Sequence, residues 1–261
     1  MSFNVQLESI STNNINMEFF YVPWDSDIFN RKIAQISKFK ILDSEKAAND
    51  YELYQKWCEK NKIEFSSCKL LHGQVNEGLF LQNKGFKFIE LNYHPFFNNL
   101  ALLKLPASNI EIQKAEDCDE KLLADVAETI FHNERFHKDP CVETELANKR
   151  YRIWVENAFK QEHQKVLKCI LNNQVIAFFV VEYPEPAQCF WSLVGMLPEF
   201  QGKGLGKQVW QAMLKYHQQE AISTVSTSIS SHNVPVFNLY VALGFRFPEP
   251  FITLHCLHNK A

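Results

Sequence analysis

The chain has 261 residues, enough for one large domain or two modest ones, and 46% hydrophobic residues with only eight glycines indicate a packed globular protein. Its net charge of −3 provides no basic surface of the kind that binds nucleic acid or an anionic membrane. No apolar run approaches the length of a membrane span and the N-terminus lacks the pattern of a signal peptide, so we expect a cytoplasmic protein with no nucleic-acid or membrane partner.

The first 105 residues are expected to form a smaller α/β unit. Apolar or alternating runs predict strands over residues 19–22, 32–41, 64–71 and 85–91, and helical spacing predicts helices over 44–63 and 74–83. Residues 80–88 resemble residues 239–247, so the unit is interpreted as a degenerate half-copy of the second domain, with chance similarity as the alternative. Pro106 to Asn109 is the best linker because it is short, polar and begun by proline.

Residues 106–261 are expected to form the second domain. A strand over 110–112, a helix over 121–131 and a polar insert over 132–140 precede an amphipathic helix over 143–159. Asn172-Asn173 then joins the strands 165–171 and 175–183 as a hairpin. An apolar strand, a helix, a strand over 222–229, a helix begun by Asn233 and a last strand over 245–257 complete the chain. This alternation predicts an α/β or α+β layered architecture.

Three glycines follow the apolar strand that stops at Pro198. Gly202, Gly204 and Gly206 open a helical pattern, and glycine lets the backbone take positive φ and approach a ligand closely. Because N–H groups at a helix start favour phosphate, we expect a pyrophosphate-bearing cofactor. A P-loop is disfavoured because its Gly-Lys-Ser/Thr ending is missing, and a Rossmann fingerprint because the glycine spacing is wrong. A plain glycine-rich turn is the remaining alternative.

A second motif supports the cofactor interpretation. Asn233, Tyr240 and Gly244-Phe245 come one short strand after the glycine loop, and a helix would place Asn233 and Tyr240 on one face. Together with the order Gln201-x-x-Gly204-x-Gly206, this pattern resembles the acetyl-CoA site of the GNAT superfamily of N-acetyltransferases. The resemblance implies a GNAT fold with a central mixed, mostly antiparallel sheet flanked by helices, preceded by a smaller degenerate GNAT-like α/β domain.

The resemblance also implies the chemistry of the site. Acetyl-CoA would be the cofactor, and Tyr240 would protonate the departing thiolate as a general acid. The alternative for Tyr240 is a core tyrosine whose hydroxyl finds a partner. Gly195 suggests a splayed, bulged strand edge whose N–H groups bind the pantetheine arm and polarise the carbonyl. The residues expected to contact the cofactor are Val194, Gly195, Met196, Gln201, Gly202, Lys203, Gly204, Leu205, Gly206, Asn233 and Asn238.

The resemblance narrows to the dTDP-4-amino-sugar N-acetyltransferases, the group that includes dTDP-fucosamine acetyltransferase. The motifs that carry it are Trp24-Asp25-Ser26-x-x-Phe29, Arg135-Phe136-His137-x-Asp139-Pro140, Tyr151-x-x-Trp154-x-x-Asn157, Asn233-x-Pro235 and His255. It implies a nucleotide-linked amino sugar as acceptor, in lipopolysaccharide or O-antigen biosynthesis. The acceptor-site candidates are Arg135, His137, Asp139 and His255. Ile229 to His232 stand where the group usually has Thr-Gln, and Val236 replaces a customary alanine. We expect cofactor binding to survive these changes, whereas the identity of the sugar and of its nucleotide is less secure.

Several features stay open at this level. Candidates for the base that neutralises the amine are Glu134, His137, His255 and a water chain. For Arg135 and Asp139 the alternative is a solvated loop with a helix-capping aspartate. No metal site is expected, since the histidines of the HxxH at 255–258 would point to opposite faces of a strand. Seven cysteines without CxxC spacing predict reduced, buried thiols, none of which has the signature of a nucleophile.

The sequence therefore predicts an acetyl-CoA-dependent N-acetyltransferase that acts on the amino group of a nucleotide-linked deoxyamino sugar by direct transfer. The first alternative is a GNAT enzyme acting on a peptide, a polyamine or another small amine. A catalytically silent CoA-binding protein is the second alternative, and a dinucleotide oxidoreductase is the third. The sequence leaves open the acceptor, the acyl group and whether the chain forms a homodimer.

Overall fold

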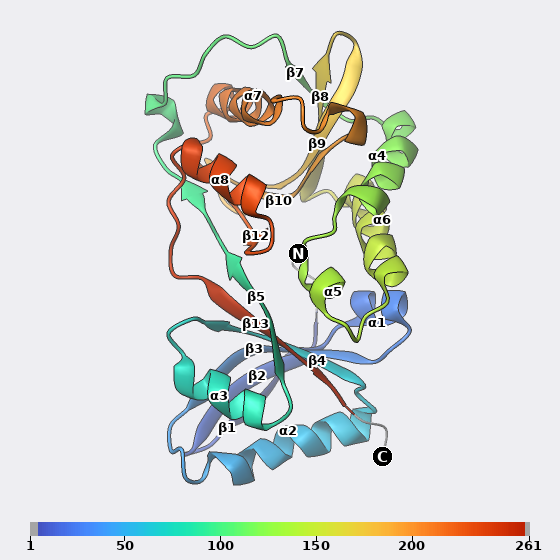
Figure 1. The fold of residues 1–261 in the computed structure, drawn as a ribbon. Helices are drawn as coiled ribbons and strands as arrows, with labels where there is room; N and C mark the ends of the chain where they lie inside the picture. The colour runs from blue at the N-terminus through green and yellow to red at the C-terminus, as the bar shows by residue number, and fades with distance from the viewer. Residues whose placement is uncertain (1–4, 259–261) are drawn as a thin grey trace. The chain divides into compact units, whose positions relative to one another are not determined.

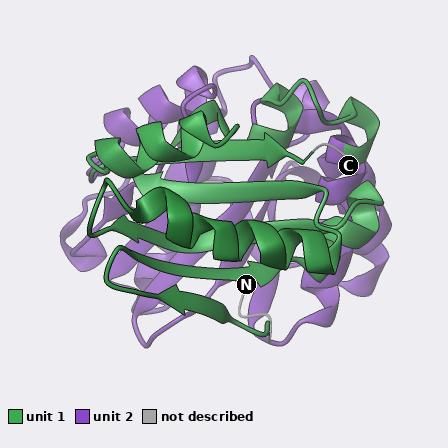
Figure 2. Ribbon diagram, turned by 90° about the horizontal axis from the view of Figure 1, so that it is seen from below, with its two compact units in different colours: residues 1–92, 135–146, 249–261 green, residues 93–134, 147–248 purple. Residues whose placement is uncertain are grey.

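A computed structural model describes residues 5–258, which fall into two compact units (Figure 2). Of these, residues 5–92, 135–146 and 249–258 form unit 1, and residues 93–134 and 147–248 form unit 2. This division differs from the predicted boundary between residues 105 and 106, because two later segments belong to unit 1. The cause is strand pairing and side-chain packing between residues far apart in the sequence, which local patterns do not reveal. The half-copy interpretation of the first 105 residues stays a prediction.

Unit 1 is built on a sheet with the strand order β1-β2-β3-β4-β13-β5 (Figure 1). The strands are β1 (Glu8–Ser11), β2 (Ile15–Tyr21), β3 (Ile33–Ile41), β4 (Phe65–Leu71), β5 (Lys87–Tyr93) and β13 (Phe251–Leu257). β3 and β4 run parallel, and the other neighbouring pairs run antiparallel. β13 thus lies between β4 and β5, although the whole of unit 2 separates it from β5 in the sequence.

The two faces of the unit 1 sheet differ in character because side chains alternate along each strand. On one face, Ile36, Cys68 and Leu254 are fully buried in an apolar core that includes Tyr51 and Tyr54 of α2. The helices α2 (Ala47–Asn61) and α3 (Val75–Asn83) cover this face (Figure 1). The other face is polar, and the short helices α1 (Pro23–Phe29) and α5 (Arg135–Lys138) pack at its edge through aromatic rings.

Unit 2 contains a sheet with the order β6-β11-β10-β9-β8-β7. Its strands are β6 (Phe96–Phe97), β7 (Glu111–Lys114), β8 (Gln164–Leu171), β9 (Gln174–Glu182), β10 (Gln188–Met196) and β11 (Thr224–Thr227), and a short strand β12 (Ile229–Ser230) comes after them. β10 and β11 are parallel, and the other pairs are antiparallel. Asn172 and Asn173, both with positive φ, form the tight turn that the sequence predicts between β8 and β9.

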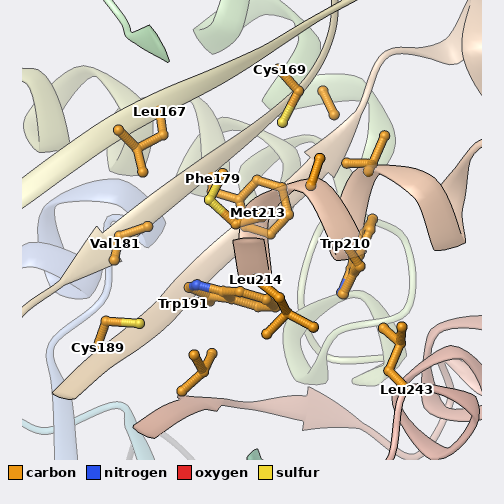
Figure 3. Packing of buried hydrophobic residues seen from close by; sticks show 14 of the residues in the cluster. Leu167, Cys169, Phe179, Val181, Cys189, Trp191, Trp210, Met213, Leu214 and Leu243 are labelled. Atoms are coloured by element: carbon orange, nitrogen blue, oxygen red, sulfur yellow. The ribbon is translucent and has the colours of Figure 1, made fainter. Parts of the chain in front are cut away.

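Helices cover both faces of the unit 2 sheet. α7 (Gly206–Gln219) and α8 (Val234–Ala242) pack on one face, where Trp191, Trp210 and Met213 form the centre of a core (Figure 3). α4 (Asp117–Ile130) and α6 (Thr144–Lys160) pack on the other face. β9 supplies both cores because alternate residues, such as Phe178 and Phe179, point to opposite faces. The predicted layered α/β architecture is confirmed.

The helices and the cysteine thiols bear on the expectations from composition. Within residues 5–258, no helix is both long and apolar enough to cross a membrane. The thiols of Cys58, Cys68, Cys169, Cys189 and Cys256 are buried, whereas Cys118 is exposed and Cys141 is half-buried.

Candidate active site

The strands β10 and β11 diverge at the centre of unit 2. They pair only from Gln188 and Thr224 to Trp191 and Thr227, after which β10 continues to Met196 beside β9 alone. A bulge between Trp191 and Leu193 marks the point of divergence. On the side turned away from β9, the backbone of the last residues of β10 therefore has no strand partner in the described structure. Such an edge can offer N–H and C=O groups to an extended ligand.

Gly195 lies in this divergent part of β10, but for a reason that the sequence did not reveal. Its φ is not positive, and the bulge lies upstream of it. A Cβ at this position would come within 2.5 Å of Phe178 Cε1 and 2.6 Å of Ile130 Cδ1. Glycine is needed here because α4 and β9 pack directly against the backbone of β10.

The glycine loop connects the end of β10 to α7. Gly202 and Gly204 have φ values of +71° and +74°, which are strained for any residue with a Cβ. Gln201 Nε2 donates a hydrogen bond to the Met196 carbonyl at 2.8 Å, which ties the loop to the end of the splayed strand. Lys203 Nζ lies 5.6 Å from the centre of the Phe200 ring.

The first turn of α7 is arranged for an anion. The residue before the helix is Leu205, whose side chain cannot accept a hydrogen bond, and the first turn contains no acidic residue. The N–H groups of this turn are therefore not capped by a side chain, and they lie at the positive end of the helix dipole. A Cβ at Gly206 would lie 3.7 Å from Leu239 Cδ2, so the start of α7 is next to α8.

Tyr240 lies on α8 within the aromatic core, with 2% of its surface exposed. Its ring contacts those of Trp191, Trp210 and Phe245, with centroid distances of 6.5, 6.3 and 4.8 Å. Burial raises the pKa of the Tyr240 phenol to about 12, although the neighbouring Trp210 and Thr227 side chains lower it in part. Thr227 is the last residue of β11 that pairs with β10, so the protonated phenol lies at the point where the strands diverge.

The other cofactor candidates also belong to unit 2. Asn233 is the N-cap of α8, and its Oδ1 accepts a hydrogen bond from the Val236 N–H at 3.4 Å. Asn238 is exposed on the same helix, and Val194 and Met196 are half-buried on the splayed strand. The structure therefore gathers the divergent strand, the glycine loop, the start of α7 and Tyr240 within one unit.

The four acceptor candidates all belong to unit 1. Asp139 and His255 form a buried pair, in which the imidazole Nδ1 and the carboxylate Oδ2 are 2.7 Å apart. Arg135 lies 3.8 Å from the buried carboxylate of Asp25, and His137 is half-buried on α5. The alternative of a solvated loop for Asp139 is wrong, because only 5% of the residue is exposed and its Oδ1 accepts the Cys141 N–H at 2.8 Å.

Electrostatics fix the protonation of the buried pair. Burial lowers the pKa of the His255 imidazole to about 4, and Arg135 and Lys69 act in the same direction while Asp139 opposes it. Burial raises the pKa of the Asp139 carboxyl, but hydrogen bonds from His255 and the Cys141 N–H outweigh burial and hold it below its usual value. At neutral pH the pair is therefore a neutral imidazole that donates its Nδ1–H to a carboxylate.

Sequence reasoning named the members of this pair without connecting them. His255 and Asp139 are 116 residues apart, so no local spacing could have indicated their contact. Asp25, which the sequence presents only as part of the Trp24-Asp25-Ser26 motif, is buried beside Arg135. Among residues 5–258, no group of three or more His, Cys, Asp or Glu side chains is placed to hold a metal ion.

Comparison with known proteins gives a family match for one part of the chain. Residues 125–245 match the Acetyltransferase (GNAT) family. Mycothiol acetyltransferases from Arthrobacter sp. (strain FB24) and Renibacterium salmoninarum are 42% and 38% identical to the chain over 53 residues. This stretch covers 20% of the chain and 16% of each relative, so the chain spans about a sixth of the length of these curated relatives.

Solved structures resemble the chain over nearly its full length. A GCN5-related N-acetyltransferase from Sphaerobacter thermophilus has a TM-score of 0.66 at 9% identity, over 94% of this chain and 81% of its own. A functionally unknown protein from Staphylococcus epidermidis has a TM-score of 0.67 at 11% identity, with coverages of 97% and 95%. A tandem GNAT protein from the clavulanic acid biosynthesis pathway has a TM-score of 0.62 at 10% identity, with coverages of 98% and 84%. At these identities the likeness shows the fold alone.

These comparisons confirm the predicted GNAT fold, which is a tandem GNAT-like architecture with the family region in the C-terminal half. The family that residues 125–245 match uses acetyl-CoA. The splayed strand, the glycine loop and Tyr240 all lie within the matched region. Residues 125–245, a little less than half of the chain, thus match the Acetyltransferase (GNAT) family.

Proposed function

We propose that the chain is an acetyl-CoA-dependent N-acetyltransferase that transfers acetyl directly to an amine, with Tyr240 as the general acid. The observation that carries this proposal is the position of a buried, protonated phenol at the point where β10 and β11 diverge. The same unit holds an uncapped helix start behind a glycine loop. A phosphate site and a proton donor on one sheet are what acyl transfer from a coenzyme A thioester requires.

The residues of unit 2 fit the cofactor. Positions that a Cβ would occupy on Gly202 and Gly204 have nothing within 4 Å, so the loop leaves room for a ligand. The N–H groups of the first turn of α7 would hold the pyrophosphate, and Lys203 would add positive charge. The free edge of β10 around Val194 to Met196 would align the pantetheine arm. When bound, acetyl-CoA supplies an activated thioester.

Tyr240 would act on the leaving group. When an amine nitrogen bonds to the acetyl carbon, the carbon–sulfur bond breaks and the sulfur leaves as a thiolate. The Tyr240 Oη–H would protonate that thiolate, because a phenol with a pKa near 12 holds its proton at neutral pH. The attacking nitrogen would release one proton as the amide forms, and this proton would restore the Tyr240 phenol, so that the products are an amide and the free CoA thiol. Burial among Trp191, Trp210 and Phe245 keeps the phenol in one orientation and excludes water.

For the acceptor, we propose the amino group of a dTDP-linked amino-deoxy sugar of the kind used in O-antigen biosynthesis. The sequence resemblance at residues 24–29, 135–140 and 151–157 supports this acceptor. Arg135, His137, Asp139 and His255 are the residues that we assign to acceptor binding. Transfer to another small amine or peptide is the alternative, and the short matches to mycothiol acetyltransferases support acetyl transfer without extending to an acceptor.

The experiment that tests this function measures release of the free CoA thiol from acetyl-CoA with a panel of amines. The panel contains a dTDP-4-amino-4,6-dideoxyhexose, D-glucosamine, spermidine and a peptide with a free N-terminus. Tyr240→Phe should lower kcat by about 10²- to 10⁴-fold while the Kd for CoA changes little.

Tyr216→Phe, on α7, provides a control for loss of a partly buried phenol and should keep wild-type kcat. An unchanged kcat in Tyr240→Phe would remove the proposed general acid. Acetylation of spermidine or the peptide but not of the sugars would move the acceptor to the alternative class. Binding of CoA without turnover of any amine would favour a silent CoA-binding protein.

A further inference from the structure

On the polar face of the unit 1 sheet, two buried side chains each have one polar atom without a protein partner among the described residues. Thr253 and His255 are two residues apart on β13 and therefore point to the same side. Thr253 is fully buried and His255 has 2% of its surface exposed. Within the described part of the chain, neither Thr253 Oγ1 nor His255 Nε2 has a hydrogen-bond partner.

The imidazole of His255 is held in one orientation. Its Nδ1 is fixed to Asp139 at 2.7 Å, and Asp139 is fixed in turn by the Cys141 N–H. The Phe136 ring stacks on one side at 5.5 Å, and the Phe65 ring contacts it edge-on at 4.9 Å. Because Nδ1 carries the proton, Nε2 presents a lone pair in a fixed direction. The ring is thus preorganised to accept one hydrogen bond.

The strands on either side of β13 add charged groups to the same face. Thr253 lies directly opposite Lys69 on β4 and Glu90 on β5, and His255 lies opposite Ser67. Glu90 and Ser67 are buried, and Lys69 Nζ lies 3.4 Å from the Asn92 side-chain oxygen. A core strand that served packing alone would carry apolar residues at positions 253 and 255, as it does at Leu254 on the opposite face.

Buried polar groups in folded proteins almost always have a partner, and an unpaired one costs stability unless a ligand or ordered water completes it. Two such atoms, two residues apart on one strand and next to a buried carboxylate, mark a place where a bound molecule would complete the hydrogen bonds. The Nε2 lone pair selects a donor, which is an O–H or N–H group. Glu90 and Lys69, both opposite Thr253, bring one charge of each sign to this face, so it suits a polar ligand that carries donor and acceptor groups.

We propose that Thr253 and the Asp139–His255 pair form a binding site for a small, hydroxylated amine, and that an amino sugar is the ligand. His255 Nε2 accepts a hydrogen bond from a hydroxyl or amino group of the ligand, and Thr253 Oγ1 completes a second bond. Asp139 is a positioning residue, since it holds the imidazole tautomer and does not touch the ligand. In identifying this ligand with the acceptor, the inference rests on the proposed function.

Binding is tested without acetyl-CoA, so that its outcome is separate from catalysis. The imidazole nitrogens of the ¹⁵N-histidine-labelled protein are followed by NMR while D-glucosamine, or a dTDP-4-amino-4,6-dideoxyhexose, is added. We expect a saturable shift of the His255 Nε2 resonance with at least one of the two probes. The resonance of His217 Nε2, which already accepts the Trp191 indole N–H, should stay in place. His255→Asn assigns the signal.

Matched variants test whether the two atoms bind the ligand. Thr253→Val keeps the shape but removes the hydroxyl, and we expect a Kd about tenfold weaker together with a higher thermal midpoint, because an unpaired buried hydroxyl is lost. Thr253→Ser retains the hydroxyl and should bind like the wild type. His255→Asn retains a donor toward Asp139 but lacks Nε2, so it should lose binding while CoA still binds.

The outcomes separate this site from the proposed function. If neither probe moves His255 Nε2, or if Thr253→Val and His255→Asn bind as tightly as the wild type, the site does not bind amino sugars. If the resonance responds but no amine is acetylated, the binding site stands and the proposed function fails. If the sugar is acetylated with the same KM in all variants, acetyl transfer stands and this site is overturned.

Discussion

His217 and His255 are buried histidines, one in each unit, and burial lowers the pKa of both imidazoles from 6.5 to about 4. His217 accepts the Trp191 indole N–H, and His255 donates to Asp139. Since the unfolded chain takes up these protons at higher pH than the folded one, stability is complete above about pH 6.5 and is lost as the pH falls toward 4. Each histidine contributes roughly 3 kcal/mol over that interval.

Urea unfolding followed between about pH 7 and pH 4.5 checks this expectation. The free energy of unfolding should fall as the pH falls, because the unfolded state binds more protons than the folded one. His255→Asn should reduce this difference by about one proton, since the substituted side chain does not titrate. A free energy of unfolding that is constant from pH 7 to pH 5 would contradict the assigned pKa values.

At the scale of single residues, the sequence singled out important positions, but it did not reveal the physical cause that makes each of them important. Gly195 was expected to mark a bulged strand edge, but it is required because Ile130 and Phe178 occupy the space of a Cβ. For Asp139, a helix cap in a solvated loop was the alternative to acceptor binding, but the residue is buried against His255. Both reasons depend on atoms from distant segments, which no pattern around the residue itself contains.

α7 begins without a side-chain cap, so a capping residue at position 205 should change both the stability of the helix and the binding of CoA. Leu205→Asp would supply a carboxylate cap to the N–H groups of the first turn and would favour the helix dipole. We expect stability to rise by up to about 1 kcal/mol. The same carboxylate would occupy the N–H groups assigned to the pyrophosphate and repel its charge, so CoA should bind at least about tenfold more weakly.

Leu205→Asn is the matched control, because it caps the same N–H groups without adding charge. Thermal unfolding should rank both variants above the wild type, and calorimetric titration with CoA should rank Asp below Asn and Asn below the wild type. Equal CoA affinity in all three proteins would show that the start of α7 does not hold the cofactor phosphate.

Elements defined by local chemistry were predicted well, and those defined by distant pairing were not. The hairpin at Asn172-Asn173 follows from residues that tolerate positive φ, and the helix start at Asn233 follows from a capping side chain. By contrast, the last strand was predicted over 245–257, whereas β13 covers only Phe251–Leu257 and pairs with β4 and β5. The alternation of apolar and polar residues in this strand fits either sheet. The sequence therefore did not show which strands it pairs with or in which register.

At the scale of the whole molecule, unit 1 depends on two later segments: residues 135–146 interrupt unit 2 in the sequence, and residues 249–258 follow it. Residues 1–105, the predicted first domain, lack β13 and residues 135–146. Without β13, the sheet loses the strand that joins β4 to β5, and Leu254 and Cys256 leave the core. We expect the fragment 1–105 to unfold without cooperativity and to give a poorly dispersed ¹H–¹⁵N spectrum.

Adding a synthetic peptide of residues 249–258 to the fragment tests the cause. The peptide supplies the backbone hydrogen bonds that β13 makes to β4 and to β5, so it should restore spectral dispersion. A peptide with Leu254→Asp should not restore it. A fragment 1–105 that unfolds cooperatively by itself would show that β13 is dispensable for unit 1.

The position of β13 also determines when unit 1 can form during synthesis. About 160 residues separate the end of β5 from the start of β13, which a ribosome adds in roughly 10–30 s at typical elongation rates. Throughout that interval, β4 and β5 expose unpaired backbone edges next to an incomplete apolar core. Unit 2 lies between these strands in the chain, so its synthesis is complete before β13 is made. We therefore expect the N-terminal half to be translated first but to complete its sheet only after β13 has emerged.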